Sequence, residues 1–286
     1  MWPRRLILTS SNQKEVAELW FLFVAVIISV IGVFRIKIPA KPAEIITPLG
    51  EFQPTVPVTV VEDQEPTETP VVKKKLASIL ILGDSMIVEG FGPRLTNDLS
   101  VFVDLKVVRR GKYSTGLNRI DVFDWYKNSK ELILEFKPEV LVVMFGANDS
   151  QNILDKQGNP FGLGDSEWDG VYLQRVSDYM ILISPMVEKI YWVGQPAARE
   201  MVFSLRLKHL NQMYEDTAGK FPNIRFVSTW ERFTKEGKYQ VLVADEEGVS
   251  KRVKTDDGIH MTDHGSKIMS QLVIEQIKSD YELDLK

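Results

Sequence analysis

The sequence lacks cysteine altogether and contains only three histidines, His209, His260 and His264, among its 286 residues. The absence of cysteine excludes disulfides, thiolate metal ligands and a cysteine nucleophile together. With so few histidines, a histidine-rich metal centre is nearly excluded, and chemistry that needs an imidazole has few candidates. Basic residues are in slight deficit, with 35 Lys and Arg against 39 Asp and Glu. This balance does not favour a nucleic-acid partner, which requires a basic surface.

One long uncharged segment, residues 19–34, stands near the N-terminus. It is slightly shorter than the ~20 residues of a typical membrane span, but Trp20 at one end and Arg35 and Lys37 at the other suit the two interfaces. A buried core helix and a cleaved signal peptide are the alternatives. The basic residues after the segment argue against cleavage, which needs small neutral residues there. We therefore expect residues 1–38 to form an uncleaved, single-pass membrane anchor.

Residues 39–75 have the composition of a linker, with seven of the 14 prolines and the polar tract VEDQEPTETP. Such a segment cannot bury enough apolar surface to fold, and its prolines keep it extended. We expect a spacer that holds the following domain, residues 76–286, away from the membrane. Because the basic residues on the two sides of the apolar segment nearly balance, they do not decide the orientation. The spacer favours a periplasmic or extracellular domain.

From residue 76 onward, short apolar runs alternate with longer amphipathic stretches. The pattern predicts strands at 76–82, 101–108, 139–145, 190–194 and 224–228, and helices at 118–136, 168–188, 199–218 and 262–281. Nearly continuous apolar strands joined by helical crossovers indicate a parallel sheet covered on both faces. We therefore predict an α/β fold, a flavodoxin-like three-layer α/β/α sandwich with a five-stranded parallel sheet. Ligands of such sheets bind at the carboxyl ends of the strands.

Ser85 follows the first predicted strand, in the sequence Gly83-Asp84-Ser85. A hydroxyl at a strand-to-helix turn lies at the carboxyl edge of the sheet, and a backbone N–H there stabilises negative charge. Serine is also a favoured helix cap, so this tripeptide alone does not separate nucleophile from cap. A second Gly-Asp-Ser ends at Ser166, after a glycine-rich loop and before a helical pattern. We expect Ser166 to be a helix N-cap and not a nucleophile.

Two other strand ends carry residues that can stabilise an oxyanion. Asn148 follows the third predicted strand, and its side-chain amide is a suitable donor, although asparagine also favours turns. Gly116 follows the second predicted strand and can offer its backbone N–H, with Gly111 as the alternative. Neither position is a specific signal by itself.

Asp257 and His260 stand three residues apart in a loop before the last predicted helix. A carboxylate at this spacing can accept the N–H of the imidazole and leave its other nitrogen free to take a proton from serine. A solvated loop histidine is the alternative. His260 and His264 are also spaced like a metal-binding pair, but the glutamate of a zinc protease is missing between them, so no metal is expected. Thr262 is expected to cap the last helix.

Together these segments resemble the SGNH hydrolases, also called the GDSL family, over residues 76–281. The resemblance implies that Ser85 is the nucleophile, that His260 is the base and that Asp257 orients the base. It also implies an oxyanion hole built from three donors: the Ser85 N–H, the Gly116 N–H and the Asn148 side-chain amide. No Gly-x-Ser-x-Gly elbow occurs, which argues against the α/β-hydrolase fold.

Four longer stretches resemble an uncharacterised and mostly exported bacterial branch of this superfamily: VLVVMFGANDSQ, SEWDGVYLQRV, IYWVGQPAAR and DDGIHMTDHG. The resemblance implies a serine esterase or acyltransferase that needs no cofactor. Its substrate would be an O-acyl ester, first of all an O-acetyl ester, of a cell-envelope glycan, or else a small ester. A membrane acyl donor would be its partner in a transfer reaction. The alternative is a non-catalytic module of the same fold for glycan binding or assembly, and the complete motif set argues against it.

The segment between Asn148 and the next predicted helix, residues 151–168, is long and rich in glycine. Long loops at the catalytic edge of a sheet are usually functional or disordered. We interpret this one as a lid on the substrate side, with Trp168 as either a wall of the site or ordinary core packing.

Overall fold

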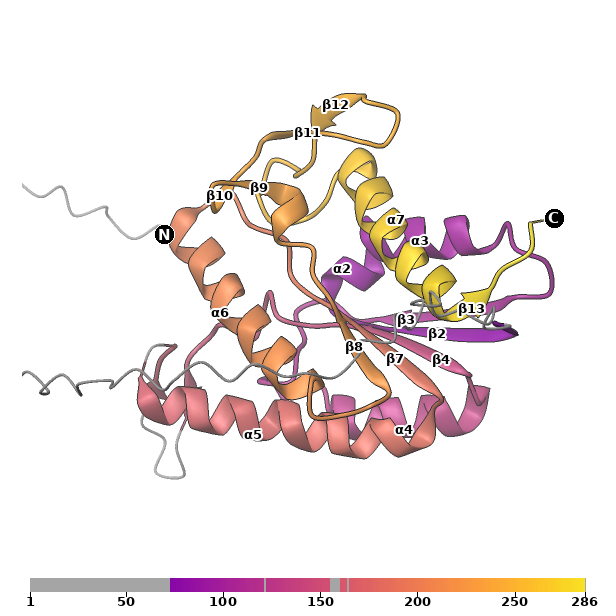
Figure 1. Cartoon of the computed structure of the whole chain (residues 1–286). Helices are drawn as coiled ribbons and strands as arrows, with labels where there is room; N and C mark the ends of the chain where they lie inside the picture. Colours follow the sequence, from indigo (N-terminus) through magenta and orange to yellow (C-terminus); the bar gives the residue numbers. More distant parts are fainter. Residues whose placement is uncertain (1–72, 121, 155–159, 164, 286) are drawn as a thin grey trace, which may run out of the picture. The chain divides into compact units, whose positions relative to one another are not determined.

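The computed structural model describes residues 73–120, 122–154, 160–163 and 165–285. The predicted membrane anchor and all but the last three residues of the predicted linker lie outside the described residues. Within the described ranges, no helix is long and apolar enough to cross a membrane. The described part of the chain is an α/β domain (Figure 1).

Five parallel strands form the central sheet: β2 (Ser78–Gly83), β3 (Lys106–Gly111), β4 (Val140–Met144), β7 (Lys189–Val193) and β8 (Ile224–Val227). Their order is β3-β2-β4-β7-β8, which is the flavodoxin-like order. Leu80 of β2 is paired with Val108 of β3 on one side and with Leu141 of β4 on the other. The prediction of a five-stranded parallel sheet is therefore confirmed. Ligand sites of such sheets lie where the strand order reverses, here between β2 and β4.

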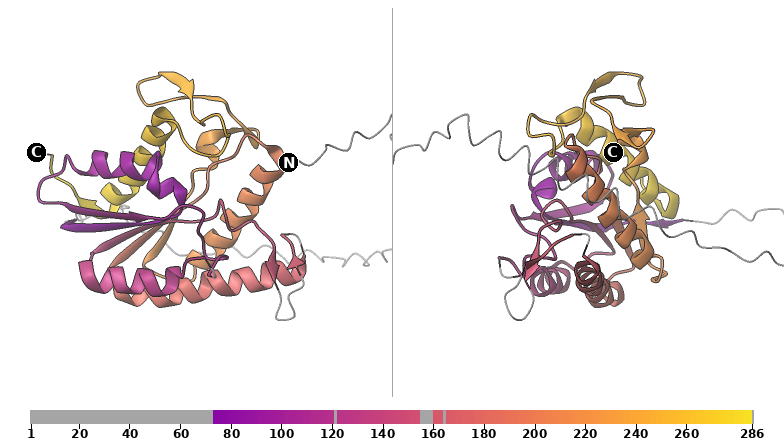
Figure 2. Two further views of the ribbon diagram at one scale, coloured as in Figure 1. Left: turned by 180° about the vertical axis from the view of Figure 1, so that it is seen from behind. Right: turned by 90° about the vertical axis from the view of Figure 1, so that its left-hand side faces the viewer.

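Helices cover both faces of the sheet, as the two views in Figure 2 show. One face packs against α4 (Trp125–Phe136), α5 (Ser166–Ile183) and α6 (Met201–Ala218), and the other against α2 (Ser85–Val88), α3 (Phe91–Leu99) and α7 (Asp263–Asp280). Alternate residues of β2 enter the two cores, because successive side chains of a strand point to opposite faces. Leu80 and Leu82 enter the first core, and Ile79 and Ile81 the second.

Several predicted boundaries are wrong for identifiable reasons. The second strand begins at Lys106 and not at residue 101, because Asp104 has a φ of 59°, which a strand does not adopt. The helix predicted from residue 118 begins at Trp125, where Asp124 caps it by accepting the N–H of Lys127. Helix α3 was not predicted, since its sequence FGPRLTNDL contains a Gly-Pro pair that is typical of a turn.

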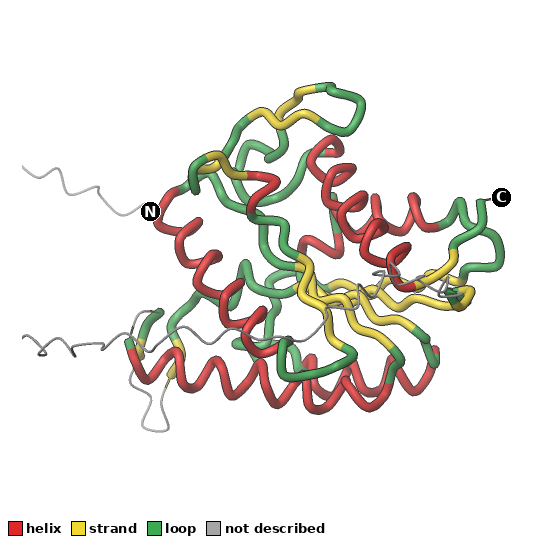
Figure 3. The backbone as a smooth tube through the Cα atoms, in the orientation of Figure 1, coloured by secondary structure: helices red, strands yellow, loops and turns green. Residues whose placement is uncertain are grey.

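Short strands surround this framework (Figure 3). The last two residues of the predicted linker form β1 (Lys74–Lys75), which pairs in parallel with β13 (Tyr281–Glu282). The predicted lid contains β5 (Ile153–Leu154) and β6 (Pro160–Phe161). Between β8 and α7 come two antiparallel pairs, β9 (Thr234–Lys235) with β10 (Lys238–Tyr239), and β11 (Leu242–Ala244) with β12 (Ser250–Arg252). The described part of the chain also contains two 3₁₀ turns, Ser184–Met186 and Glu231–Phe233.

Candidate active site

Ser85 lies two residues beyond the end of the buried part of β2, at the start of the short helix α2. The N-cap of this helix is Asp84, whose carboxylate accepts the N–H of Met86 at 3.0 Å. Ser85 is therefore the first helical residue, and the alternative that it merely caps the helix is wrong. Gly83 allows the close approach of β2 to β4 here, since a Cβ on it would lie 2.1 Å from the carbonyl oxygen of Met144.

The structure brings Ser85, His260 and Asp257 into one hydrogen-bonded chain. His260 Nε2 lies 2.8 Å from Ser85 Oγ, and His260 Nδ1 lies 2.6 Å from Asp257 Oδ2. The other oxygen of Asp257 accepts hydrogen bonds from the Ile259 N–H, the His260 N–H and the Thr255 hydroxyl. These contacts hold the imidazole between a carboxylate and a hydroxyl, which is the arrangement needed to activate a serine.

The charge of Asp257 is stabilised by its donors. Partial burial acts to raise the pKa of this carboxyl, but hydrogen bonds from His260, Ile259 and Thr255 outweigh that effect and hold it well below the ordinary value. Asp257 is therefore ionised at neutral pH, and an ionised carboxylate stabilises the imidazolium that forms when His260 takes a proton.

Several residues around the Ser85–His260–Asp257 hydrogen bonds were not predicted from the sequence. Glu89 Oε1 lies 3.5 Å from His260 Nε2, and its other oxygen accepts the hydroxyl of Tyr113. The buried Lys254 donates to the carbonyl of Ile259 at 2.6 Å. Arg199 supports the same loop, since its backbone N–H bonds to the Gly258 carbonyl and its guanidinium to two further loop carbonyls. Burial lowers the pKa of Lys254 to about 7.

The three predicted oxyanion donors lie on adjacent elements. The Asn148 amide donates to the Thr115 carbonyl at 3.0 Å, which places it beside Gly116. Within the described residues, the backbone N–H groups of Ser85 and Gly116 have no protein acceptor. Gly111, the alternative to Gly116, is packed against α2 instead, because a Cβ on it would lie 2.8 Å from the Val88 nitrogen. The geometry therefore favours Gly116 as the donor.

Asp84, directly before Ser85, is a buried carboxyl within the site. Burial raises its pKa to about 7, and the nearby charge of Asp149 adds to that effect, while the N–H groups of Met86 and Ala147 oppose it. The sequence signalled Asp84 only as part of the Gly-Asp-Ser motif, and its burial could not be predicted from that motif.

The remaining predicted residues lie outside the hydrogen-bonded chain. His264 Nε2 bonds to the Val243 carbonyl, so it does not form a pair with His260, and no metal-binding group of three or more His, Asp or Glu occurs among the described residues. Ser166 begins α5 but is not its N-cap, because Asp165 occupies that position. Thr262 caps α7 as predicted. Trp168 is 0% exposed and stacks on Tyr172 at 4.8 Å, so it is core packing and not a wall of the site.

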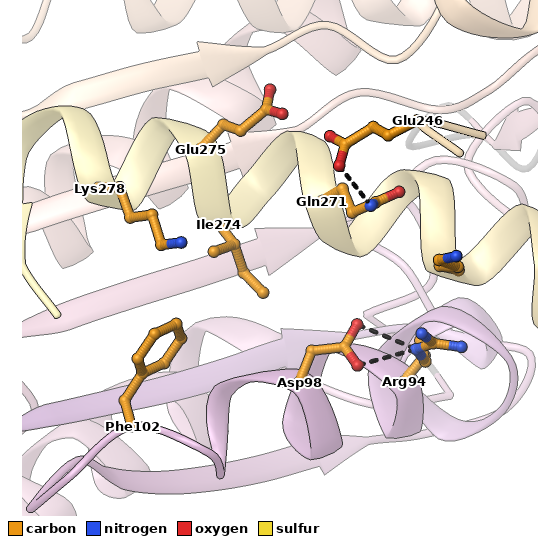
Figure 4. Close-up of a pocket in the computed structure, with 9 residues that line it drawn as sticks. Arg94, Asp98, Phe102, Glu246, Gln271, Ile274, Glu275 and Lys278 are labelled. Carbon is orange, nitrogen blue, oxygen red and sulfur yellow. Dashed lines mark hydrogen bonds and ion pairs between the residues drawn. The ribbon is translucent and has the colours of Figure 1, made fainter. Parts of the chain in front are cut away.

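A hollow of about 330 Å³ lies between α3 and α7 (Figure 4). Some of its polar side chains bond to one another. Arg94 bonds to both oxygens of Asp98, and Gln271 donates to Glu246 at 2.8 Å. None of the three residues of the Ser-His-Asp chain lines it, and we assign it no chemistry.

The flavodoxin-like fold and the Ser85–His260–Asp257 hydrogen bonds have the arrangement that the resemblance to the SGNH hydrolases implies. The structure is similar to a lipase/acylhydrolase from Enterococcus faecalis, with a TM-score of 0.52 and 18% identity over 74% of this chain and 99% of that one. It is also similar to a catalytic mutant of an acetylxylan esterase from Geobacillus stearothermophilus, with a TM-score of 0.53 and 16% identity over 73% and 96% of the two chains. At these identities the likeness establishes a shared fold. The chain belongs to the family described as "Protein of unknown function (DUF459)", whose model matches residues 78–276. No curated protein matches the sequence.

Proposed function

We propose that this protein is a serine esterase or acyltransferase that acts on an O-acyl ester, first of all O-acetyl, of a cell-envelope glycan. The observation that carries the proposal is the contact of 2.8 Å between Ser85 Oγ and His260 Nε2, with Asp257 at 2.6 Å on the other ring nitrogen. This arrangement supplies a nucleophile, a base and a group that orients the base.

The reaction proceeds in two acyl-transfer steps. His260 takes the proton of Ser85 as its oxygen attacks the ester carbonyl carbon, and the Ser85 N–H, Gly116 N–H and Asn148 amide stabilise the resulting oxyanion. His260 then gives the proton to the departing alcohol oxygen, which leaves an acyl group on Ser85. Water, or a sugar hydroxyl in a transfer reaction, loses its proton to His260 and attacks the acyl-enzyme. The proton returns to Ser85 as the acyl group departs.

A polar hollow supports a hydroxyl-rich substrate. About 420 Å³ of space lies beside the segment that follows Gly116, lined mainly by amide and guanidinium side chains: Asn118, Arg119, Gln151, Asn152 and Arg175. Convergent polar groups of this kind fix the orientation of a ligand. The named activity of the acetylxylan esterase with the same fold agrees with an acetylated glycan.

A second hollow favours a different substrate, an ester of a longer acyl chain. It has a volume of about 390 Å³ and is lined by Met201, Leu205, Trp230 and Tyr239. It also contacts Arg199, whose backbone N–H bonds to the loop that carries His260. A series of p-nitrophenyl esters from acetate to octanoate separates the two candidates. We expect kcat/KM to be highest for acetate, and a maximum at the longer chains would favour the second.

A fluorophosphonate probe tests the proposal that the protein is an enzyme, because it labels only an activated serine. We expect the full chain to be labelled, Ser85→Ala to be unlabelled, and the matched variant Ser166→Ala to be labelled like the wild type. Release of acetate from an O-acetylated glycan then tests the substrate. A folded wild-type protein that resists the probe would instead support the non-catalytic glycan-binding or assembly module.

We also propose that the enzyme is anchored in the bacterial inner membrane by residues 1–38, with residues 76–286 on the outer side. The apolar segment 19–34 and the proline-rich segment 39–75 support this location. A C-terminal alkaline phosphatase fusion is expected to be active, and a green fluorescent protein fusion exported through the Sec route to be dark. The reverse pattern would place the domain in the cytoplasm and remove a cell-envelope substrate from consideration.

A further inference from the structure

Directly after the proposed oxyanion donor Asn148 comes a fully buried carboxylate, Asp149. Its oxygens accept the backbone N–H groups of Leu117 and Asn118 at 3.1 and 2.7 Å. Asn118 also donates its side-chain amide to the Asp149 carbonyl at 3.1 Å. Asp149 therefore joins the segment after β4 to the segment after β3, which are the two segments that carry Asn148 and Gly116.

The contact with Asp149 fixes the backbone at Gly116 itself. A Cβ on Gly116 would lie 2.1 Å from Asp149 Oδ1, so the carboxylate occupies the space that any side chain would need. The next two N–H groups along the chain point to this carboxylate, whereas the N–H of Gly116 has no acceptor among the described residues. The Asn148 amide fixes the preceding residue through the Thr115 carbonyl. Gly116 is thus held from both sides with its own N–H available.

A pair of buried tyrosines completes the contacts of Asp149. The Tyr172 hydroxyl donates to Asp149 Oδ2 at 2.7 Å, and the Tyr214 hydroxyl lies 2.7 Å from that of Tyr172. Tyr214 Oη also lies 3.1 Å from the position a Cβ would take on Gly146, at the start of the Asn148 segment. Tyr172 and Tyr214 come from α5 and α6, so two helices of one layer support the same pair of segments.

The chemistry of a carboxylate suits this position better than that of an amide. A carboxylate has two oxygens that both accept hydrogen bonds, and it meets two N–H groups and one O–H here. An asparagine would present its NH₂ group to one of these donors. Burial raises the pKa of Asp149 above its ordinary value, and the donors Asn118, Tyr172 and Leu117 offset only part of that effect. Burial also raises the pKa of Tyr172 well above its ordinary value, so this tyrosine remains a donor at neutral pH.

We propose that Asp149, held by Tyr172 and Tyr214, is the positioning residue of the oxyanion hole: its carboxylate sets the direction of the Gly116 N–H and the place of the Asn148 amide. The inference rests on the proposed serine esterase function. Asp149 does not contact the substrate. It acts through the two donors, and its effect falls on the transition state because the oxyanion exists only there.

The test compares Tyr172→Phe and Asp149→Asn with a matched control, Tyr179→Phe. Tyr179 lies on the same helix and is equally buried, but its hydroxyl bonds to Ser129 at 2.7 Å and not to Asp149. With p-nitrophenyl acetate we expect kcat to fall about 10-fold in Tyr172→Phe and about 100-fold in Asp149→Asn, with KM within about twofold. Tyr179→Phe is expected to keep the wild-type kcat.

A transition-state analogue supplies the readout that a purely structural role would not change. A trifluoromethyl ketone forms a tetrahedral oxyanion on Ser85, so its inhibition constant is expected to rise in Tyr172→Phe in proportion to the loss of kcat/KM, and to be unchanged in Tyr179→Phe. If Asp149→Asn does not fold, the comparison of Tyr172→Phe with Tyr179→Phe tests the inference. Equal kcat values for the two tyrosine variants, or a loss confined to KM, would overturn the inference. A wild-type protein without turnover or fluorophosphonate labelling would instead overturn the proposed function.

Discussion

The two halves of the site are built in different ways. Ser85 and the proposed oxyanion donors follow strands of the central sheet, and Ser85 is only 6% exposed. The other half is a loop between β12 and α7, in which the side chains of His260 and Asp257 are 25% and 45% exposed. The first half is fixed by core packing and by buried hydrogen bonds. The loop is held by hydrogen bonds to its backbone, among them those from Arg199 and Lys254.

This difference predicts which substitutions lower activity alone and which lower both activity and stability. A change in the buried half removes contacts that also support the core, so it is expected to lower both activity and the free energy of unfolding. A change to an exposed side chain of the loop is expected to lower activity with little effect on stability. The predictions below test this division, beginning with the largest effect.

Replacing either end of the Ser85–His260 contact is expected to have the largest effect. Ser85→Ala and His260→Ala should each lower kcat for p-nitrophenyl acetate by about 10⁴-fold or more, because each removes a group that the first step requires. Thermal unfolding followed by circular dichroism should show little change for His260→Ala. Activity that survives in Ser85→Ala but is lost in Ser166→Ala would show that Ser166, and not Ser85, is the nucleophile.

Asn148→Ala is expected to have the next largest effect, with kcat lowered by about 10²- to 10³-fold, which is the usual loss for one oxyanion donor. Because the Asn148 amide also bonds to the Thr115 carbonyl, this variant should lose stability as well, unlike His260→Ala. A melting temperature equal to that of the wild type would show that the two halves do not differ in the proposed way.

Asp84→Asn tests a smaller effect, the pH dependence of stability in the buried half. The pKa of Asp84 is raised to about 7 from its ordinary value of 3.8, so between these values the folded state binds more protons than the unfolded state. Stability is therefore lost as pH rises from about 4 to about 7. Asparagine has no such titration, so urea unfolding should show a smaller fall in the free energy of unfolding over this range. An unchanged slope would contradict the assigned pKa.

Lys254→Met tests the pH dependence of stability in the loop, where stability is expected to rise with pH and not to fall. Burial lowers the pKa of Lys254 to about 7 from 10.5, so the unfolded state binds more protons between these values, and stability rises with pH. The variant should remove this rise between about pH 7 and pH 10. It also removes the donor to the Ile259 carbonyl, so a modest fall in kcat is expected, and Lys254→Arg serves as the control that keeps a donor.

The comparison also explains what could be predicted from the sequence. Ser85, Asn148, Asp257 and His260 each follow or precede an element with a clear apolar pattern, and a parallel sheet brings the carboxyl ends of its strands to one edge. The oxyanion assignment remains a prediction. Asp149, Tyr172 and Tyr214 could not be identified, because their hydrogen bonds join segments up to 42 residues apart that no local pattern relates.

The same limit applies to element boundaries and to the loop. The wrong start of the second strand depends on the conformation of Asp104, and the missed helix α3 has a sequence typical of a turn. Lys254 is buried together with Val253, although the strand β12 that precedes them is exposed. Burial of a lysine is uncommon and is decided by tertiary packing, so nothing in the local sequence distinguishes Lys254 from a surface residue.

The pairing of β1 with β13 has a mechanical consequence. Lys74 forms ion pairs with Glu139 and Glu188, which directly precede β4 and β7. The chain therefore enters the domain at the amino edge of the sheet, the pole opposite to Ser85. A load applied through the preceding residues acts first on two residues of parallel β-structure and on exposed ion pairs. The catalytic edge lies at the opposite end of the strands, so we expect fraying of β1 to leave the contacts of Ser85 unchanged.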